Sequence, residues 1–283
     1  MTRPPPLHEI GSDLRRLALW RRAVACCTPF VAAAASLILL WQQRWLLGIA
    51  GTVVLSFVTY GSVSHDLVHR TYRLPLWLNH LLLSAMEMTA LRSGTAYRLS
   101  HLNHHRYYPT SDAEVDPEAV AAGRGVLVGL LDGPKQQLRI VRWAWRHHRA
   151  EHGVALGLEA AVIVGIWATG AALTIGSGQP GLLFYAGLVT AGAWTIPLIT
   201  VTIPHEPEAD NAQRQTRAFR GVGFDALAFG HLYHLEHHLY PNVPHQRWRE
   251  LAAGLDGYLA AEGIEPLTLG SWARRLPDVG SGE

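Results

Sequence analysis

Four long apolar runs constrain the fold of this chain more than any other feature. They cover about residues 23–41, 46–64, 154–175 and 182–203. Each run is close to the roughly 20 residues that an α-helix needs to cross a hydrocarbon core about 30 Å thick. The pattern therefore predicts four transmembrane helices, with a buried helical core in a soluble protein as the alternative for such runs.

Lysine and arginine are unevenly distributed around these runs. The first run is preceded by Arg15, Arg16, Arg21 and Arg22, and residues 135–149 are rich in basic residues. The turn between the third and fourth runs, GSGQPG, carries no charge. Cytoplasmic loops of membrane proteins carry an excess of Lys and Arg. We therefore expect two hairpins in the inner (cytoplasmic) membrane, with both termini and the middle segment cytoplasmic. Four runs of spanning length with this charge asymmetry are rare in soluble helical proteins.

The segments outside the runs fit a single membrane domain at residues 23–270, between a cytoplasmic leader at 1–22 and a C-terminal tail at 271–283. Prolines at 4–6 predict a flexible start over residues 1–13. Residues 74–91 have too short an uncharged stretch for a further span and predict an interfacial or re-entrant helix. Residues 135–149 combine arginines with Trp143 and Trp145, which is typical of a helix on an anionic membrane surface.

Composition excludes two other classes of protein. The formal charge of +2 is small and no basic stripe with stacking aromatics is present, so we expect no nucleic-acid partner. The two cysteines, Cys26 and Cys27, are adjacent in an apolar run, which argues against a structural disulfide.

Histidines are concentrated in three groups that follow the apolar runs. HDLVH at 65–69 begins where the second run ends, and HLNHH follows at 101–105. HLYHLEHH at 231–238 repeats the HxxHH pattern of the second group. Spacings of three and four residues place side chains on one helix face. Neutral imidazole suits iron, zinc, copper or nickel, and this many histidines exceed the needs of one tetrahedral zinc. An HxxxH pair alone is a weak signal, but three groups at one membrane face predict two metal ions.

Fold class and site therefore combine into one expectation. The chain is predicted to be an all-α integral membrane protein with four transmembrane helices in two hairpins. A cytoplasmic helical cap would carry a histidine-rich di-metal site.

The chain resembles the membrane fatty acid desaturase superfamily, which includes acyl-lipid desaturases and carotenoid ring ketolases and hydroxylases. The resemblance lies in HDLVH at 65–69, HLNHHRYYPTSDAEVDPE at 101–118 and YHLEHHLYPNVP at 233–244. It implies two non-haem iron ions (Fe2+/Fe3+) and O2 as co-substrate. By motif position it implies as metal ligands His65, His69, His101, His104, His105, His234, His237 and His238.

The family usually adds a ligand or water-binding residue outside the three boxes. His205, in TIPHEPE at the end of the fourth run, and His231, one turn before the third box, are both candidates. His205 is slightly favoured, with an interfacial histidine as its alternative role. For His231 the alternative is to support or cap the site.

Metal-bound histidines usually donate their second ring N–H to a carboxylate or a carbonyl. The nearby acids that are candidates for this role are Asp66, Asp112, Asp116, Glu206, Asp225 and Glu236. Glu236 is expected to point away from the metals, where a salt bridge to Arg106, Arg247 or Arg249 is an alternative. His147, His148 and His152 continue the arginine-rich surface helix and are expected to contact solvent or headgroups.

The leading hypothesis is a membrane-embedded di-iron, O2-dependent oxidoreductase that desaturates or hydroxylates a C–H bond of a long lipid, such as a fatty acyl chain. A carotenoid ring ketolase or hydroxylase is the nearest alternative, because the TSDAEVDPE loop and the PHE stretch at 204–206 look similar to that branch. A divalent-metal transporter is the alternative from another class, although transporters place ligands near the bilayer midplane. No nucleotide, ferredoxin or haem motif is found, so we expect a separate ferredoxin- or cytochrome-type electron donor and a lipid substrate from the bilayer.

Overall fold

The computed structural model describes residues 3–11, 13–110, 112–209, 211, 213–221, 230–268 and 270–271. These residues form helices and two isolated β-bridges, His205–Thr216 and Phe219–Leu267. The helices are α1 (Leu7–Ile10), α2 (Leu19–Trp41), α3 (Trp45–Val58), η1 (Thr59–Ser64), α4 (His65–Val68), α5 (Leu76–Thr89), α6 (Gly94–Tyr107), η2 (Ala119–Ala121), α7 (Val126–His147), α8 (Ala150–Ser177), α9 (Gly181–Pro197), η3 (Leu198–Thr202), α11 (His234–Leu239), η4 (His245–Arg247) and α12 (Trp248–Ala261). The expected all-α fold is confirmed for the described part of the chain.

Four helical segments in this part of the chain are long and apolar enough to cross a membrane. They are Leu19–Trp41, Trp45–Val68, Ala150–Ser177 and Gly181–Thr202, and they coincide with the four apolar runs. Two helices begin about four residues before the predicted runs, at Leu19 and Ala150, because an α-helix continues through the polar residues that flank its apolar part. The segment 74–91 forms the 14-residue helix α5, which is too short to span.

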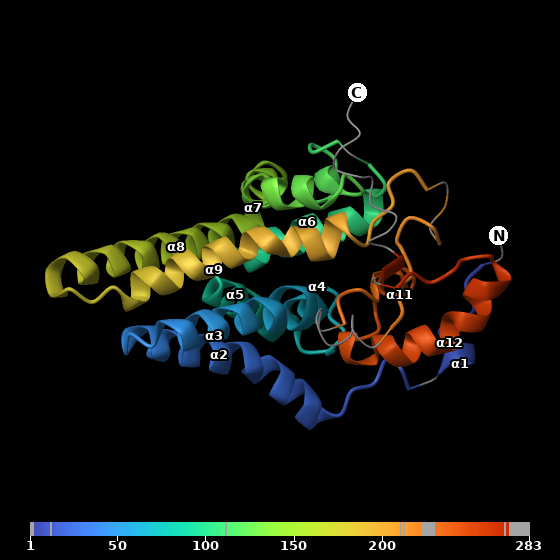
Figure 1. Ribbon diagram of the computed structural model, residues 1–283, viewed down its shortest axis with the longest axis horizontal. Helices are drawn as coiled ribbons and strands as arrows, with labels where there is room; N and C mark the ends of the chain where they lie inside the picture. The colour runs from blue at the N-terminus through green and yellow to red at the C-terminus, as the bar shows by residue number, and fades with distance from the viewer. Residues whose placement is uncertain are drawn as a thin grey trace.

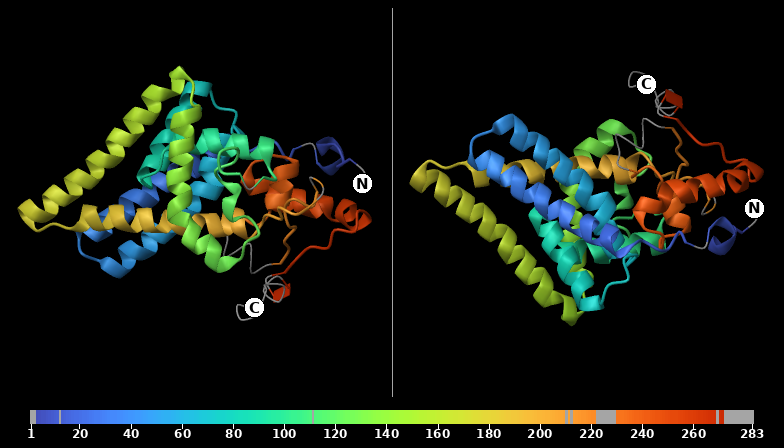
Figure 2. Two further views of the ribbon diagram at one scale, coloured as in Figure 1. Left: turned by 90° about the horizontal axis from the view of Figure 1, so that it is seen from above. Right: turned by 90° about the horizontal axis from the view of Figure 1, so that it is seen from below.

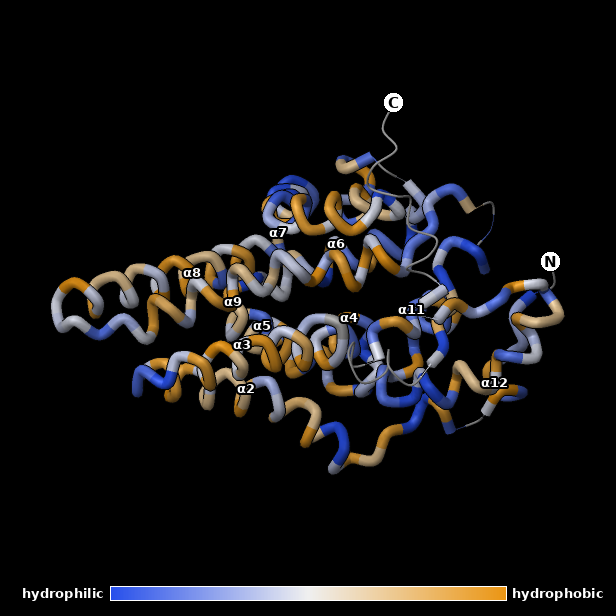
Figure 3. The backbone as a smooth tube through the Cα atoms, viewed as in Figure 1, coloured by the Kyte–Doolittle hydropathy of each residue, from blue (hydrophilic) through white to orange (hydrophobic). Residues whose placement is uncertain are grey.

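Helices α2, α3 and α9 lie side by side and extend away from the end of the molecule that holds α11, whereas α8 diverges from α9 beyond the turn that joins them (Figure 1, Figure 2). Helix α3 packs against α2 and α9, and α8 packs against α9. Their outer surfaces are apolar, with Leu46 83% exposed and Ile175 87% exposed (Figure 3). Apolar faces of this size on a helical bundle are typical of a membrane interaction surface. Together with the four spans, they make this a membrane protein.

Helix α7 runs across α9 at a steep angle (Figure 2). Glycines permit this crossing: a Cβ built on Gly133 would lie 1.8 Å from the Trp194 carbonyl oxygen, and one on Gly129 would lie 2.4 Å from the Thr202 hydroxyl. Small residues at such crossings allow helix backbones to approach closely. The crossing holds α7 beside η3, close to the histidine groups.

We expect Gly133→Ala to destabilise the fold, since the added methyl group overlaps backbone atoms that cannot move independently of α9. Overpacking of this kind costs about 1–3 kcal/mol and occasionally more. Gly157→Ala on α8 is the matched control, because a Cβ there meets no atom within 4 Å. Thermal unfolding in detergent should show a lower midpoint for Gly133→Ala alone. Equal midpoints would mean that the helix crossing tolerates a side chain at this position.

The N-terminal segment differs from the flexible leader that its prolines predict. Leu14 and Leu17 are buried, and Leu7 and Ile10 pack against the same apolar cluster as α12. The Tyr240 hydroxyl, just after the third histidine group, also donates a hydrogen bond to the Pro5 carbonyl. The regularly spaced apolar side chains of residues 7–17 therefore outweigh the local effect of the prolines.

Two π-helical turns lie next to the histidines. η1 directly precedes His65, and η3 ends three residues before His205. Single π-turns are uncommon and frequent at functional sites, because they shift the side chains that follow around the helix axis. Here each turn sits at the point where an apolar span reaches the polar end of the molecule.

Candidate metal centre

The structure gathers nine histidines into two groups at one end of the helical bundle. In each group one ring nitrogen from every member lies within 4.8 Å of those of the others. The five-histidine group consists of His65, His69, His101, His105 and His237, and the four-histidine group of His104, His205, His234 and His238. Most of these side chains are buried, several completely.

Helical spacing explains how two HxxHH motifs serve two groups. On α6, His101 and His105 are four residues apart and join the five-histidine group, while His104 joins the other group. On α11 the assignment is reversed: His234 and His238 join the four-histidine group, and His237 joins the five-histidine group. Residues three and four positions further along a helix both lie near the first one, but they are about 100° apart around the helix axis and so reach different points. Both motifs therefore contribute to both groups.

Ring nitrogens within each group face one another. The Nε2 atom of His205 lies 3.0 Å from that of His104 and 3.2 Å from that of His234. In the five-histidine group, the Nε2 atoms of His105 and His237 are 2.7 Å apart. The buried Nε2 of His69 has no hydrogen-bond partner among the residues that the structure describes. Several lone pairs directed at one point in a buried space are what a bound cation requires.

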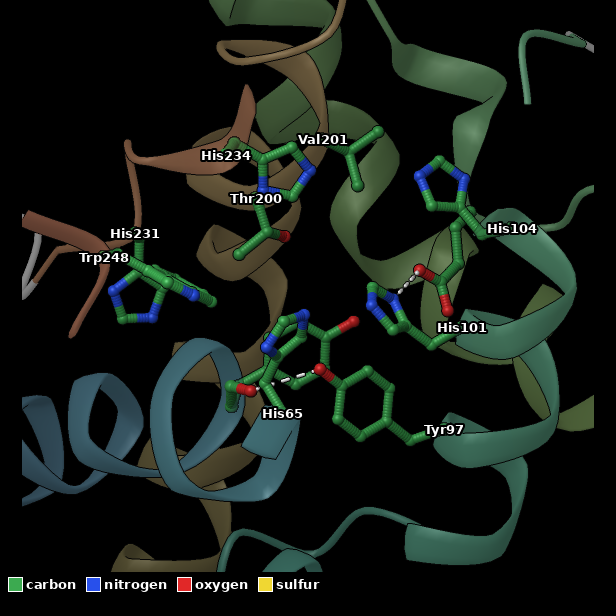
Figure 4. A pocket seen from close by; sticks show the side chains of 11 residues that line it. His65, Tyr97, His101, His104, Thr200, Val201, His231, His234 and Trp248 are labelled. Carbon is green, nitrogen blue, oxygen red and sulfur yellow. Dashed lines mark hydrogen bonds and ion pairs between the residues drawn. The ribbon is translucent and has the colours of Figure 1, made fainter. Parts of the chain in front are cut away.

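The opposite ring nitrogens are held by acceptors that fix the orientation of the rings. His104 Nδ1 lies 2.7 Å from Asp116 Oδ2, and His101 Nδ1 lies 3.0 Å from Glu118 Oε2 (Figure 4). His205 Nδ1 lies 2.9 Å from the Val201 carbonyl oxygen, to which it donates. Donation from Nδ1 leaves the Nε2 lone pair free for a metal.

Asp116 thus lies beside a histidine as the sequence suggested, whereas Glu118 was missed. Both acids are buried in the loop after α6, and Glu118 also accepts a hydrogen bond from the Ser100 hydroxyl at 2.6 Å. The available signal was the Asp-Pro-Glu sequence 12 to 14 residues after the middle histidine of the second box. Sequence alone gave no reason to prefer these two acids over the exposed ones beside them.

The other candidate acids contact different partners. Asp66 is buried and accepts a hydrogen bond from the His245 backbone N–H at 3.0 Å, and it also pairs with the His245 ring. Asp112 is exposed and caps the Glu114 backbone. Glu206 pairs with Arg217 at 2.6 Å. Asp225 lies outside the described residues.

Glu236 is completely buried between the histidines of the third box. It pairs with Arg220 at 2.7 Å, which corrects the expected pairing with Arg106, Arg247 or Arg249. Arg220 also binds Asp256 on α12 at 2.8 Å. Arg220 lies 16 residues before Glu236 in the sequence, so it was not among the arginines that the sequence suggested as partners.

His205 and His231 are placed differently. His205 belongs to the four-histidine group, whereas His231 is outside both groups and packs edge-on against Phe57 with ring centroids 6.1 Å apart. His231 is nevertheless buried and lines the cavity beside the metal groups (Figure 4). The geometry therefore favours His205 over His231 as a metal ligand.

Burial keeps most of these histidines neutral. It lowers the pKa of His69, His105, His205, His234, His237 and His238, and the neighbouring histidines lower it further. For His104, burial also lowers the pKa, but the Asp116 carboxylate outweighs it and the net shift is upward. Neutral imidazole is the form that binds a metal, so at pH 7 those six histidines, whose pKa is lowered, need not lose a proton first.

Two small cavities adjoin the histidines. The first is lined by His65, His101, His104 and His234 together with Tyr97, Glu118, Val201 and Trp248, and the second by Ser56, Phe57, Thr195, Ile196 and Ile199. Tyr60, Thr200 and His231 line both. Each has a volume of about 20 Å³, enough for about one water molecule. Together they lead from the histidines into the apolar space between η1 and η3.

Comparison with known families decides the identity of this arrangement. A sequence model of the family described as fatty acid desaturase matches residues 39–266. The chain belongs to the fatty acid desaturase family. The match includes all three histidine boxes and His205, and it identifies the protein as an oxidoreductase family member. A search among curated proteins found no match.

Substitutions of Asp116 and Glu118 test whether the carboxylates that hold His104 and His101 matter in this desaturase family member. We expect Glu118→Gln and Asp116→Asn each to lower metal affinity or product formation by about 10–100-fold, because such partners fix the tautomer and orientation of a ligating histidine. Asp112→Asn is the matched control, since Asp112 is exposed and contacts only its own loop. Iron content per chain and product yield would be measured together. Equal losses in all three variants would point to the loop as a whole.

Proposed function

We propose that the protein is a membrane-embedded di-iron oxidoreductase that uses O2 to desaturate or hydroxylate a C–H bond of a long lipid chain. The observation that carries this proposal is the pair of histidine groups at the ends of four apolar spans in a member of the fatty acid desaturase family.

The donor set fits two metal ions. Each group offers four or five imidazole nitrogens and, among the described residues, no carboxylate oxygen, a set that suits iron among the first-row metals. We propose His65, His69, His101, His105 and His237 as ligands of one iron, and His104, His205, His234 and His238 as ligands of the other. When bound, a di-iron centre supplies O2 activation and the oxidising power to remove hydrogen from an unactivated C–H bond.

The surrounding residues orient the ligands and exclude water. Asp116, Glu118 and the Val201 carbonyl hold the second nitrogens of three histidines. Trp248 covers the five-histidine group, with its ring centroid 5.4 Å from that of His65 and 5.3 Å from that of His237. The Tyr97 hydroxyl donates to the Tyr60 carbonyl in η1 at 3.2 Å, which fixes one wall of the cavity. A rigid, dry pocket determines which C–H bond reaches the metals.

We propose that substrate enters from the bilayer between η1 and η3. The second cavity lies there among apolar and hydroxyl side chains and joins the metal cavity at Thr200 and His231. A C–H bond presented at this junction faces both histidine groups. Loss of a second hydrogen would give an alkene, and return of oxygen an alcohol.

The topology proposed from the positive charges supports the same function. Two hairpins with cytoplasmic termini would place the histidine end at the cytoplasmic face, within reach of a soluble ferredoxin- or cytochrome-type electron donor. Lys135, Arg142 and Arg149 on and beside α7 are exposed there and offer a docking patch for an acidic carrier, and Arg146, which is also exposed, pairs with Glu114 at 2.8 Å. Arg139 instead pairs with Asp132 within α7.

A carotenoid ring ketolase or hydroxylase is the second candidate. The PHE stretch that resembles this branch contributes His205, which the structure places in the four-histidine group. The junction of the cavities is also lined by Thr200 and His231, polar groups suited to an oxygenated ring.

Mass spectrometry of lipids and carotenoids tests both candidates. Aerobic hosts that make only fatty acids or also β-carotene would express the wild-type protein, His101→Ala or His237→Ala. We expect a new product that has lost two hydrogens or gained oxygen in the wild type, and none in either variant. Folded, iron-loaded protein that gives no product in several hosts with a competent reductase would overturn the proposal and favour a metal-handling role.

A further inference from the structure

A separate groove, distinct from the two small cavities beside the histidines, lies on the other side of α6 from the metal cavity. It is a groove of about 360 Å³ between α5, α6 and α8, and it contains none of the grouped histidines. This volume is within the range of about 300–1,000 Å³ that is typical of small-ligand sites.

Two buried polar atoms in this groove lack partners. Nε of Arg98 on α6 and Nδ1 of His152 on α8 are both buried from solvent, and neither makes a hydrogen bond within the described part of the chain. Buried donors without acceptors are unfavourable, so such atoms in a cavity point to a ligand. A ligand with acceptor oxygens between α6 and α8 would satisfy both.

The charges around the groove indicate whether that ligand is positively or negatively charged. Burial, together with the nearby Arg70 guanidinium, lowers the pKa of Arg98, and the pKa of His80 is lowered by burial and by Arg98 and Arg70. These shifts mark an excess of positive charge near the guanidinium. The groove therefore favours an anion.

The two acids that line the groove do not neutralise Arg98. Glu159 is buried and receives hydrogen bonds from the Ser93 hydroxyl and from the Thr95 hydroxyl and backbone N–H. Its carboxylate is thus occupied at the start of α6. Glu151 is largely exposed, and its carboxylate lies 3.9 Å from the Nε2 atom of His152.

The rest of the groove is apolar and faces the bilayer. His80 and His152 mark its polar end, and Met88 and Val162 line it eight and ten residues further along α5 and α8. At 1.5 Å per residue these positions lie about 12–15 Å deeper. Leu81 and Leu158 also line the groove and are more than half exposed on helices that adjoin lipid.

We propose that this groove binds an anionic membrane phospholipid, with its phosphate between Arg98 and His152 and an acyl chain along α5 and α8. A soluble phosphate would use the polar end alone and would leave the apolar walls without a role. The site is separate from the proposed metal centre and does not depend on the proposed reaction.

The test measures lipid binding to the purified, full-length protein in detergent. Phosphatidylglycerol, phosphatidylcholine and glycerol phosphate would each be titrated, with thermal unfolding and native mass spectrometry as readouts. We expect phosphatidylglycerol to raise the unfolding temperature and to remain bound, and the other two to have little effect. Arg98→Gln should weaken phosphatidylglycerol binding about tenfold or more, because it removes a charge-assisted hydrogen bond.

Two further variants keep the test independent of any folding defect in Arg98→Gln. His152→Ala should weaken binding of the same lipid. Ala155→Phe should prevent its binding by filling the groove, which Ala155 lines. Arg142→Gln, an exposed arginine on α7 outside the groove, is the charge-matched control and should bind like the wild type. Equal binding of both phospholipids, equal stabilisation by glycerol phosphate, undiminished binding in Ala155→Phe, or equal weakening in Arg142→Gln would each overturn the proposal.

Discussion

Replacing His205 with alanine is expected to remove one of the two irons that we propose and to lower product formation by more than about 100-fold. The reason is geometric: the Nε2 atoms of His104 and His234 both lie about 3 Å from that of His205, so His205 is central to the four-histidine group. Loss of a partner that merely orients a ligand costs about 10–100-fold, and loss of the ligand itself should cost more. Iron per chain and product yield are the measurements.

His231→Ala is the matched control for this experiment. His231 is also a buried histidine, but it lies outside both groups and lines the junction of the two cavities. We expect this variant to keep both irons and to change the product ratio or the apparent substrate affinity. If His231→Ala loses iron while His205→Ala keeps it, the proposed ligand set is wrong.

The second large effect concerns Arg220, which should be essential to the stability of the third box. Arg220→Met leaves the carboxylate of Glu236 fully buried without its partner at 2.7 Å, and it also removes the link to Asp256. Breaking a buried ion pair from one side typically costs about 3–5 kcal/mol. Denaturant or thermal unfolding would measure this loss of stability. The variant should also release iron bound at α11 at a lower temperature than the wild type does.

A double variant separates the charge effect from lost packing. Arg220→Met combined with Glu236→Gln removes both charges, so most of the lost stability should return, since removing both members of such a pair costs far less than removing one. A double variant as unstable as the single one would show that the packing and hydrogen bonds of Arg220, rather than the charge of Glu236, hold the segment.

The parts of this structure that sequence predicts are those set by local periodicity. The four apolar runs became four helices of spanning length, since length and hydrophobicity suffice to define such helices. Helical spacing also brought histidines four residues apart into the same group, namely His65 and His69, His101 and His105, and His234 and His238. What the boxes could not reveal is that each HxxHH is divided between two groups, because this depends on how α6 and α11 face each other.

Long-range contacts account for what sequence did not predict. His205 and His231 were nearly equivalent candidates in the sequence, and only packing after η3 brings one of them to the metal group. Glu118 and Arg220 were overlooked because their partners, His101 and Glu236, lie 17 and 16 residues away across loops. The N-terminal prolines suggested flexibility over residues 1–13, yet Leu7 and Ile10 pack against the apolar cluster of α12, which is distant in the sequence.

Division of adjacent histidines between the two groups has a consequence for how such a centre evolves. His104 and His105 are neighbours in sequence yet belong to different groups, and so are His237 and His238. One inserted or deleted residue in either helix would rotate the following side chains by about 100° and misplace donors for both ions at once. The register of α6 and α11 therefore couples the two proposed ions: a substitution of one histidine can remove one ion alone, whereas a change in the length of either helix disturbs both sites.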